Sequence, residues 1–456
     1  MEIHVKETNL VRPAQETPNH SLWISTLDLL MAERPQVPLV HFYRRPPLPA
    51  SDKSGFFDTS LLKEGLSKAL VAFYPLAGRL GKDENGRLQI ECNGEGALFV
   101  EAETSCVIHD EFGEDDFSPS LKMRQLVPTF DCPSTQISSN PLLLLQVTYF
   151  KCGGVCLGIG WHHILGDGTS AFHFINSWAE LTRGFSLISI TPLIDRTILQ
   201  SRALPYPIFD HIEYRPPPSM NFEELQSSPL PTSMARLKLS LDKINTLKAK
   251  FKKDHGVMYS TYEILVAHIW RCACLARRLP DDQVTKLYNA RKWTAKIKSP
   301  LPYGYFGNVI FHATPIALAG DIQSKPLIYT VKIIYEALKR RDDEYLRSGL
   351  AYLGQHDPDL TAVKQGVPTC KCPNLKIASW AKMPMYDSDF GWGSPIYMGR
   401  ASVPSVGESY VLSSPYNERS LSLIICLETH AMELFKKLFY SEGVGPLKEY
   451  YKLSSL

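Results

Sequence analysis

Eight prolines crowd one segment near the middle of the chain, and they limit the possible folds more than any other feature. They fall between residues 190 and 232, at Pro192, Pro205, Pro207, Pro216, Pro217, Pro218, Pro229 and Pro231. Because proline lacks a backbone donor and cannot continue a helix, this segment is predicted to be an extended crossover on the surface. The 456 residues are long enough for two domains of roughly 200 residues each. We therefore expect one domain at 1–189, the crossover at 190–232 and a second domain at 233–456.

Helical and strand patterns alternate on both sides of the crossover. Residues 59–73 and the segment after Gly168 carry apolar side chains at helical spacing, whereas 142–150 and 155–161 are apolar enough to be central strands. The second half is expected to contain strands at 235–240, 375–382 and 421–427 and helices at 241–251, 260–277, 326–339, 342–353 and 429–440. This alternation predicts an α/β fold.

Charge and hydropathy exclude several classes of function. The chain has 49 basic and 47 acidic residues, a net charge of +2, which gives no general attraction to nucleic acid or to an acidic membrane. Its apolar runs are far shorter than the ~20 residues that span a bilayer, and its N-terminus does not resemble a secretory signal. We therefore expect a cytoplasmic protein that acts on small molecules without membrane insertion.

The ten cysteines do not indicate a metal site. The close pairs Cys152/Cys156, Cys272/Cys274 and Cys370/Cys372 lack the C-x2-C spacing of a zinc site. Free thiols in a reducing compartment and no bound metal are the expectation.

One histidine-rich loop lies between a buried strand and a helix, where side chains are held rigidly and can still face a cavity. It reads Trp161-His-His163-Ile-Leu-Gly-Asp167-Gly168. A neutral imidazole can take a proton from an attacking hydroxyl, so His163 is a candidate general base. From the residues alone a structural role is favoured, in which Asp167 caps the next helix and Gly168 eases the turn, because two adjacent histidines are more often structural than catalytic.

Two further segments are candidates. Asp389-Phe-Gly391-Trp392-Gly393 places two glycines beside aromatic residues, which predicts a bent loop where backbone packs closely. In the expected strand at 377–380, Ala378 and Trp380 share one face. An indole N–H can donate to an oxyanion, although a tryptophan in a buried strand is more often part of the core.

Taken together, these motifs resemble those of BAHD acyltransferases of plants. The His163-x-x-x-Asp167-Gly168 and Asp389-Phe-Gly-Trp-Gly393 signatures lie about 220 residues apart, and the likeness extends from Val11-Arg-Pro-Ala14 to Gly304-Tyr-Phe-Gly-Asn308. The resemblance implies two similar domains like chloramphenicol acetyltransferase, with an active-site channel between them. It also implies a monomer that uses an acyl-CoA as substrate and has no permanently bound cofactor.

The resemblance assigns roles to individual residues. His163 is then the general base, and Trp380 matches the indole that helps to hold the tetrahedral oxyanion in hydroxycinnamoyltransferases. Asp167 points away from the substrate and holds the loop through a salt bridge, with Gly168 beside it. Asp389, Gly391, Trp392 and Gly393 form a structural loop away from the reacting atoms.

The sequence departs from hydroxycinnamoyl-CoA:shikimate or quinate transferases at four pocket positions. Leu39, His41, Gln365 and Ala378 stand where those relatives have serine, tyrosine, arginine and threonine. Loss of the arginine removes a bidentate charged contact, worth roughly 1.5–3 kcal/mol. Shikimate or quinate is therefore not expected as the acceptor.

A second departure concerns the partner of Asp167. Relatives carry Asp-Gly-Arg after the strand equivalent to 286–288, and that arginine pairs with the motif aspartate. Here Thr294 stands in place of the arginine, so the sequence predicts that Arg291 or Lys292 reaches Asp167 instead, or that the loop is held differently.

Three functions remain open. Stretches such as Val11-Arg-Pro-Ala-Gln-Glu-Thr-Pro18 resemble coumarin synthases, which close an ortho-hydroxycinnamoyl-CoA on itself and need no acceptor pocket. The lost pocket residues also fit transfer to a phenolic or aliphatic hydroxyl of another molecule. A non-catalytic acyl-CoA or phenolic-binding member is the third possibility. A serine hydrolase is disfavoured because no G-x-S-x-G sequence occurs.

Overall fold

The computed structural model describes most of residues 1–441. The parts of that range left undescribed are 33–35, 47–54, 114–115, 131–136, 201–205, 221–229, 250–256, 293–300, 358, 362, 364–368 and 416–418.

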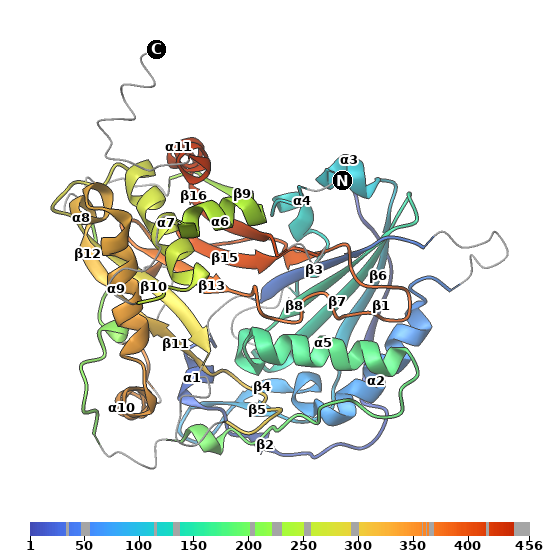
Figure 1. Cartoon of the computed structure of the whole chain (residues 1–456). Coiled ribbons are helices and arrows are strands. Elements are labelled where there is room, and N and C mark those ends of the chain that lie inside the picture. The colour runs from blue at the N-terminus through green and yellow to red at the C-terminus, as the bar shows by residue number, and fades with distance from the viewer. Residues whose placement is uncertain are drawn as a thin grey trace.

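Two mixed sheets form the framework of the described chain (Figure 1). In order across the sheet, the first contains β1 (His4–Val11), β6 (Ala97–Thr104), β7 (Leu143–Phe150), β8 (Val155–Trp161), β3 (Val37–Tyr43) and β14 (Tyr397–Arg400). The second contains β11 (Ile310–Ala313), β10 (Val284–Lys292), β13 (Leu375–Ser379), β15 (Glu408–Ser413), β16 (Leu421–Glu428) and β9 (Thr232–Leu239), with β12 (Ile316–Leu318) paired to β10. A small sheet contains β2 (Ser21–Leu22), β5 (Leu88–Glu91) and β4 (Arg79–Lys82).

Helices cover these sheets. In the first half they are α1 (Thr26–Leu29), α2 (Thr59–Ala72), α3 (Ile108–Phe112), α4 (Leu121–Arg124) and α5 (Gly168–Thr182). In the second half they are α6 (Leu241–Ala249), α7 (Thr261–Ala276), α8 (Ala319–Ser324), α9 (Leu327–Lys339), α10 (Asp343–Gly354) and α11 (Thr429–Tyr440). Figure 1 shows α2 and α5 together on one face of the first sheet. The mixed α/β fold expected from the sequence is confirmed.

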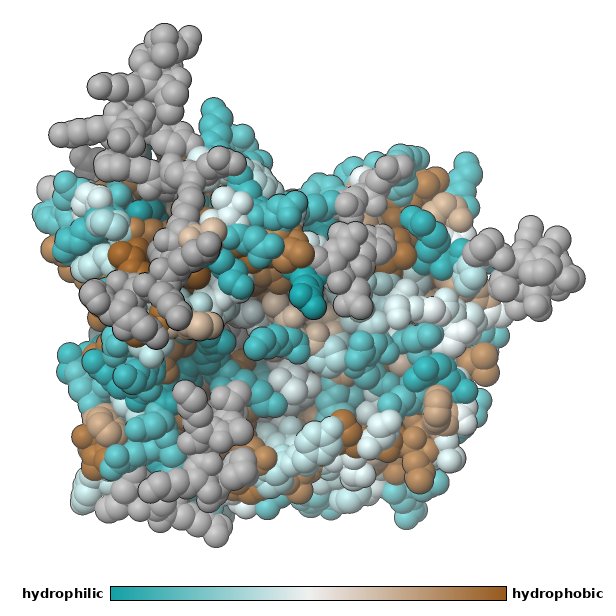
Figure 2. Space-filling view, viewed as in Figure 1, coloured by the Kyte–Doolittle hydropathy of each residue, from teal (hydrophilic) through white to brown (hydrophobic). Residues whose placement is uncertain are grey.

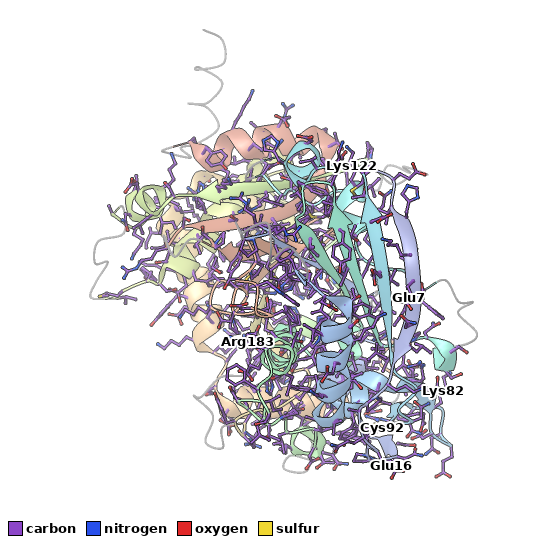
Figure 3. All side chains as sticks on the ribbon, turned by 90° about the vertical axis from the view of Figure 1, so that its right-hand side faces the viewer. Glu7, Glu16, Lys82, Cys92, Lys122 and Arg183 are labelled. Carbon is purple, nitrogen blue, oxygen red and sulfur yellow. The ribbon has the colours of Figure 1, made fainter. Side chains whose placement is uncertain are left out.

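The first half follows its sequence pattern closely. The predicted helix at 59–73 is α2, which begins after Asp58, whose side chain accepts hydrogen bonds from the N–H groups of Ser60 and Leu61. The apolar segments at 142–150 and 155–161 are β7 and β8, in the interior of the sheet with almost every residue buried. β1 is the edge strand, and its exposed Glu7 is labelled in Figure 3.

The second half contains the expected strands at β9, β13 and β16 and the expected helices at α6, α7, α9, α10 and α11. One strand is shorter than predicted, because β13 ends at Ser379 rather than at 382. The Trp380 N–H still donates to the Val411 carbonyl, but the Met383 N–H then donates to the Trp380 carbonyl and the chain turns. Trp380 therefore sits where the strand meets a turn.

One strand crosses between the halves. β14, from the second half of the sequence, pairs antiparallel with β3 of the first sheet, with Arg400 opposite Leu39. The loop before it also packs on the first half, because the Phe390 ring lies 4.8 Å from that of Trp178 on α5. The division at 1–189, 190–232 and 233–456 remains a prediction. It did not foresee that the Asp389–Gly393 loop, which belongs to the second half of the sequence, packs on the first half.

The larger hydrophobic core continues across the seam. It joins Leu39, Phe172 and Trp178 of the first half to Trp380 and Tyr410 of the second. The exterior seen in Figure 2 is largely hydrophilic, and its outline is notched where the two halves meet at the top. None of the described helices is long and apolar enough to cross a membrane.

Candidate active site

The His163 loop joins the central strand β8 to α5. His163–Leu165 form one 3₁₀ turn, and the Trp161 indole N–H donates to the Gly166 carbonyl at 2.9 Å. Asp167 caps α5, since its Oδ1 accepts from the N–H groups of Thr169 at 2.9 Å and Ser170 at 3.2 Å. The loop therefore has the capping contacts that the sequence pattern indicated, on a rigid strand-to-helix connection.

The hydrogen bonds of Asn308 define the tautomer of His163. The Asn308 amide nitrogen donates both to Asp28 Oδ1 and to the His163 carbonyl, each at 2.8 Å. Its oxygen Oδ1, 3.0 Å from His163 Nδ1, must therefore act as the acceptor. His163 consequently carries its proton on Nδ1 and a lone pair on Nε2, which is the form a general base needs.

A buried ion pair supports Asn308 from behind. Asp28 also accepts from the Asn308 backbone N–H at 2.9 Å, and its other oxygen lies 3.3 Å from Arg196 Nη1. Both charged side chains are fully buried. Arg196 donates to the carbonyls of Ile164 at 2.9 Å and Leu165 at 2.7 Å, inside the His163 loop. A residue of the predicted crossover thus fixes the loop that carries the histidine.

Asp167 is not held by the salt bridge that the sequence comparison implied. Besides its two cap contacts, Oδ2 accepts from the Val309 N–H at 3.3 Å, and no cation of the described chain lies within 4 Å. Burial raises the pKa of this carboxyl, with a smaller opposing effect from Lys292 and from the backbone donors. The Arg291 guanidinium instead lies 3.9 Å from the centre of the Tyr262 ring. Three backbone donors orient Asp167 where an arginine was expected, and Thr294 falls outside the described residues.

A cavity of about 1230 Å³ opens on His163. Its walls come from both halves, and they include His163, Trp380, Leu39 and Ala378 among the predicted site residues. Trp380 is 8 % exposed, and its indole N–H makes no hydrogen bond to any described residue, so the donor is available to a ligand. A Cβ placed on Gly168 would lie 3.8 Å from that indole nitrogen and 3.1 Å from Met383 Sδ, so a side chain there would press on the Met383 thioether.

Two predicted pocket residues are not seen in the cavity wall. His41 is fully buried, and its Nδ1 lies 3.1 Å from Ser388 Oγ instead of facing the cavity. Burial lowers the pKa of His41 to about 3, so the ring is neutral at physiological pH. The prediction that His41 lines the acceptor pocket is therefore wrong, because the segment before β14 covers it. Gln365 lies outside the described residues.

The Asp389–Gly393 loop is a structural turn away from His163. Asp389 Oδ1 accepts from the N–H groups of Gly391 at 2.8 Å and Gly393 at 2.9 Å. Both glycines have positive φ, +105° and +98°, which side chains disfavour. The Trp392 ring lies 5.1 Å from that of Phe57, so the loop is anchored by aromatic contacts with the first half.

A second histidine cluster has the composition of a hydrolase triad. His211 Nδ1 lies 3.0 Å from Glu213 Oε1, and its Nε2 lies 2.9 Å from Ser348 Oγ. Ser348 Oγ, however, also accepts from the N–H groups of Ile208 at 2.9 Å and Phe209 at 3.1 Å, so both lone pairs are used. Ser348 has no exposed surface. This cluster ties the crossover to α10 and cannot supply a nucleophile.

Sequence reasoning missed Asn308, Asp28 and Arg196 as parts of the site. Asn308 belongs to one of the stretches that carried the family resemblance, but nothing local gave it a role. Asp28 and Arg196 looked like ordinary charged residues. No cluster of three or more metal-binding side chains occurs in the part of the chain that the structure describes.

Comparison with known proteins identifies the family. The model of the Transferase family matches residues 1–442. The chain is 50% identical to shikimate O-hydroxycinnamoyltransferase of Nicotiana tabacum over 446 residues, which is 96% of this chain and 100% of that protein. It is 44% identical to rosmarinate synthase of Plectranthus scutellarioides over 448 residues, with the same coverage.

Solved structures share the fold at low sequence identity. Vinorine synthase superposes with a TM-score of 0.70 at 21% identity, covering 95% of this chain and 96% of that one. The F. graminearum TRI101 complex with coenzyme A and deoxynivalenol gives 0.74 at 18% identity, covering 91% and 96%. The chloramphenicol-acetyltransferase-like architecture expected from the sequence is thereby confirmed. The chain belongs to the BAHD acyltransferase family, whose members are enzymes that use an acyl-CoA as substrate.

Proposed function

We propose that this enzyme transfers a hydroxycinnamoyl-type group from CoA to a hydroxyl, with His163 as general base. The observation that carries the proposal is the Asn308 contact, which places the His163 proton on Nδ1 in a residue that lines a cavity between the two halves. The names of the relatives, a shikimate O-hydroxycinnamoyltransferase and a rosmarinate synthase among them, support the class of acyl donor.

In the proposed reaction, the hydroxyl oxygen attacks the thioester carbonyl carbon while its proton moves to His163 Nε2. The tetrahedral intermediate carries its negative charge on the former carbonyl oxygen, within reach of the Trp380 indole N–H. Collapse breaks the carbon–sulfur bond and expels the CoA thiolate, which takes the proton back from the imidazolium. No covalent enzyme intermediate is required, because the thioester is already activated.

Intramolecular closure to a coumarin is a second form of the same reaction. The apolar side chains of Leu39 and Ala378 in the cavity wall support it, since a tethered nucleophile needs no polar grip. In this form the attacking hydroxyl belongs to the acyl group, which must first pass from the E to the Z form of its double bond, and the products are a lactone and free CoA.

The experiment is a mass-spectrometric screen of hydroxycinnamoyl-CoA donors with hydroxyl acceptors, including reactions without acceptor. Esters that form only with acceptor indicate intermolecular transfer. Coumarin from an ortho-hydroxycinnamoyl-CoA, formed faster than in buffer, indicates closure. His163→Ala should abolish CoA release in either form, whereas the matched surface variant His109→Ala should not. Binding of every donor without thioester cleavage would contradict the proposal and favour a non-catalytic acyl-CoA-binding protein.

A further inference from the structure

One wall of the cavity carries three charged side chains that take no part in the proposed proton transfer. Arg400 ends β14, while Lys376 on β13 and Glu408 on β15 stand opposite each other in parallel strands. Each is 5–6 % exposed, and all three line the cavity. Lys376 Nζ lies 3.6 Å from Glu408 Oε1. Charged groups buried to this extent need a partner or a ligand.

Strand geometry directs this cluster toward the substrate. Side chains two residues apart on a strand share a face, so Lys376 points to the same side as Ala378, which lines the cavity. Arg400 reaches the same space from the first sheet, where it is paired with Leu39. The two cations therefore reach the same cavity from different sheets.

Most of the guanidinium N–H groups of Arg400 have no hydrogen-bond partner among the described residues. Within the described chain its only hydrogen bond runs from Nε to the Ser402 carbonyl, at 3.3 Å. The guanidinium lies 4.9 Å from the centre of the Tyr410 ring, which fixes its plane. Both terminal Nη groups are thus left with N–H donors at a cavity wall, in the planar fork that binds a carboxylate through two parallel hydrogen bonds.

A carboxylate fits the planar fork of Arg400, since its two oxygens can each accept one of two parallel N–H bonds. The phosphate groups of CoA lie at the far end of the pantetheine arm from the thioester.

We propose that Arg400, with Lys376 beside it, anchors a carboxylate of the acceptor; this inference rests on the proposed acyl transfer. The Arg400 guanidinium lies 4.9 Å from the centre of the Tyr410 ring, and that ring lies 5.1 Å from the Trp380 ring, so the guanidinium is within about 10 Å of the indole. The acceptor is therefore a hydroxy acid whose hydroxyl can lie at Trp380 while its carboxylate lies on Arg400, such as an extended aromatic hydroxy acid. Arg400 supplies the charged grip that Gln365 cannot.

The test compares wild type, Arg400→Met and Arg400→Lys, with p-coumaroyl-CoA as donor. The acceptors are para-hydroxyphenylpropanoate, shikimate and 5-hydroxyanthranilate, each beside its methyl ester. Calorimetry measures binding of each acceptor, and steady-state assays measure KM and kcat. Arg183→Met is the matched control, because Arg183 also stacks on an aromatic ring, that of Phe185, but is exposed and does not line the cavity (labelled in Figure 3).

Loss of one charge-assisted contact should raise Kd and KM for the extended acid about 10- to 100-fold in Arg400→Met, with less effect in Arg400→Lys. The methyl ester and the donor should keep their constants, as should the control variant. Equal effects on acid and ester, an effect on donor KM alone, or failure of every acid to bind wild type would each overturn the proposal. Its failure while His163→Ala still abolishes CoA release would leave the proposed function standing. Absence of thioester cleavage by wild type would overturn both.

Discussion

His163 and His211 are both held by hydrogen bonds to other side chains, yet only His163 lines the cavity between the two halves. His211 has a carboxylate on one ring nitrogen and a serine on the other, and both partners are buried. His163 has a neutral amide on Nδ1, and its ring lines the cavity. Judged by composition alone, the His211 cluster resembles a catalytic triad more closely.

The difference lies in access to the cavity. At His211 both ring nitrogens contact buried protein groups, which makes the imidazole a rigid link between the crossover and α10. At His163 the Asn308 contact sets the tautomer, and the residue lines the cavity. Access to a cavity, rather than the identity of the partners, distinguishes the two histidines.

The largest expected effect is the loss of kcat when His163 is replaced. His163→Ala should lower kcat by about 10²- to 10⁴-fold, the usual contribution of a general base. His211→Gln should keep kcat per folded molecule, because His211 does not line the cavity at His163. Steady-state rates, normalised to folded protein by circular dichroism, measure both. Equal losses of kcat in the two folded variants would show that the distinction is false.

The sequence could predict His163 but not what activates it. The strand-to-helix pattern around residues 155–182 is local, so β8, α5 and the Asp167 cap were all accessible to it. Asn308 lies 145 positions from His163 along the chain. A contact between residues so far apart leaves no periodic pattern in the sequence. It depends on how β10, β11 and the loop before β11 pack against the first half.

The same limit applies to His41 and to β14. Alternation along β3 places His41 on the face of Leu39, but Ser388, 347 positions away, contacts the ring. Folding brings β14 back to the first sheet, and a residue-by-residue comparison with relatives cannot show this crossing. Leu39 and Ala378 line the cavity, and each lies on a strand whose facing is local.

The second prediction concerns the ion pair behind His163. Asp28→Asn leaves Arg196 buried without its carboxylate, which should cost about 3–5 kcal/mol of unfolding free energy. Because Asn308 loses its charged acceptor, kcat should also fall while substrate KM stays constant. Urea unfolding and steady-state kinetics test the two parts. The exposed neighbour Asp195→Asn is the control, and a rise in KM without loss of kcat would contradict a positioning role.

The third prediction concerns Ser348, the buried partner of His211. Ser348→Ala removes the acceptor of two backbone N–H groups and the partner of His211, which should cost about 1–3 kcal/mol of unfolding free energy. Activity per folded molecule should not change. Urea unfolding and kcat are the measurements. A selective loss of CoA release in folded Ser348→Ala would show instead that the cluster takes part in catalysis.

The smallest effect involves buried His41, and it is seen only when the free energy of unfolding is followed as the pH changes. His41 has no carboxylate partner, and burial lowers its pKa from 6.5 to about 3. The unfolded chain therefore binds a proton between these values that the folded chain does not. The stability due to neutral His41 is present above pH 6.5 and is lost as the pH falls toward 3, by about 1.4 kcal/mol per pH unit.

Unfolding free energies of wild type and His41→Leu at pH 6 and pH 5 should show this slope in the difference between the two proteins. A wild-type slope unchanged by His41→Leu would mean that His41 gains a proton in the folded protein, so that burial beside Ser388 does not exclude the charged form.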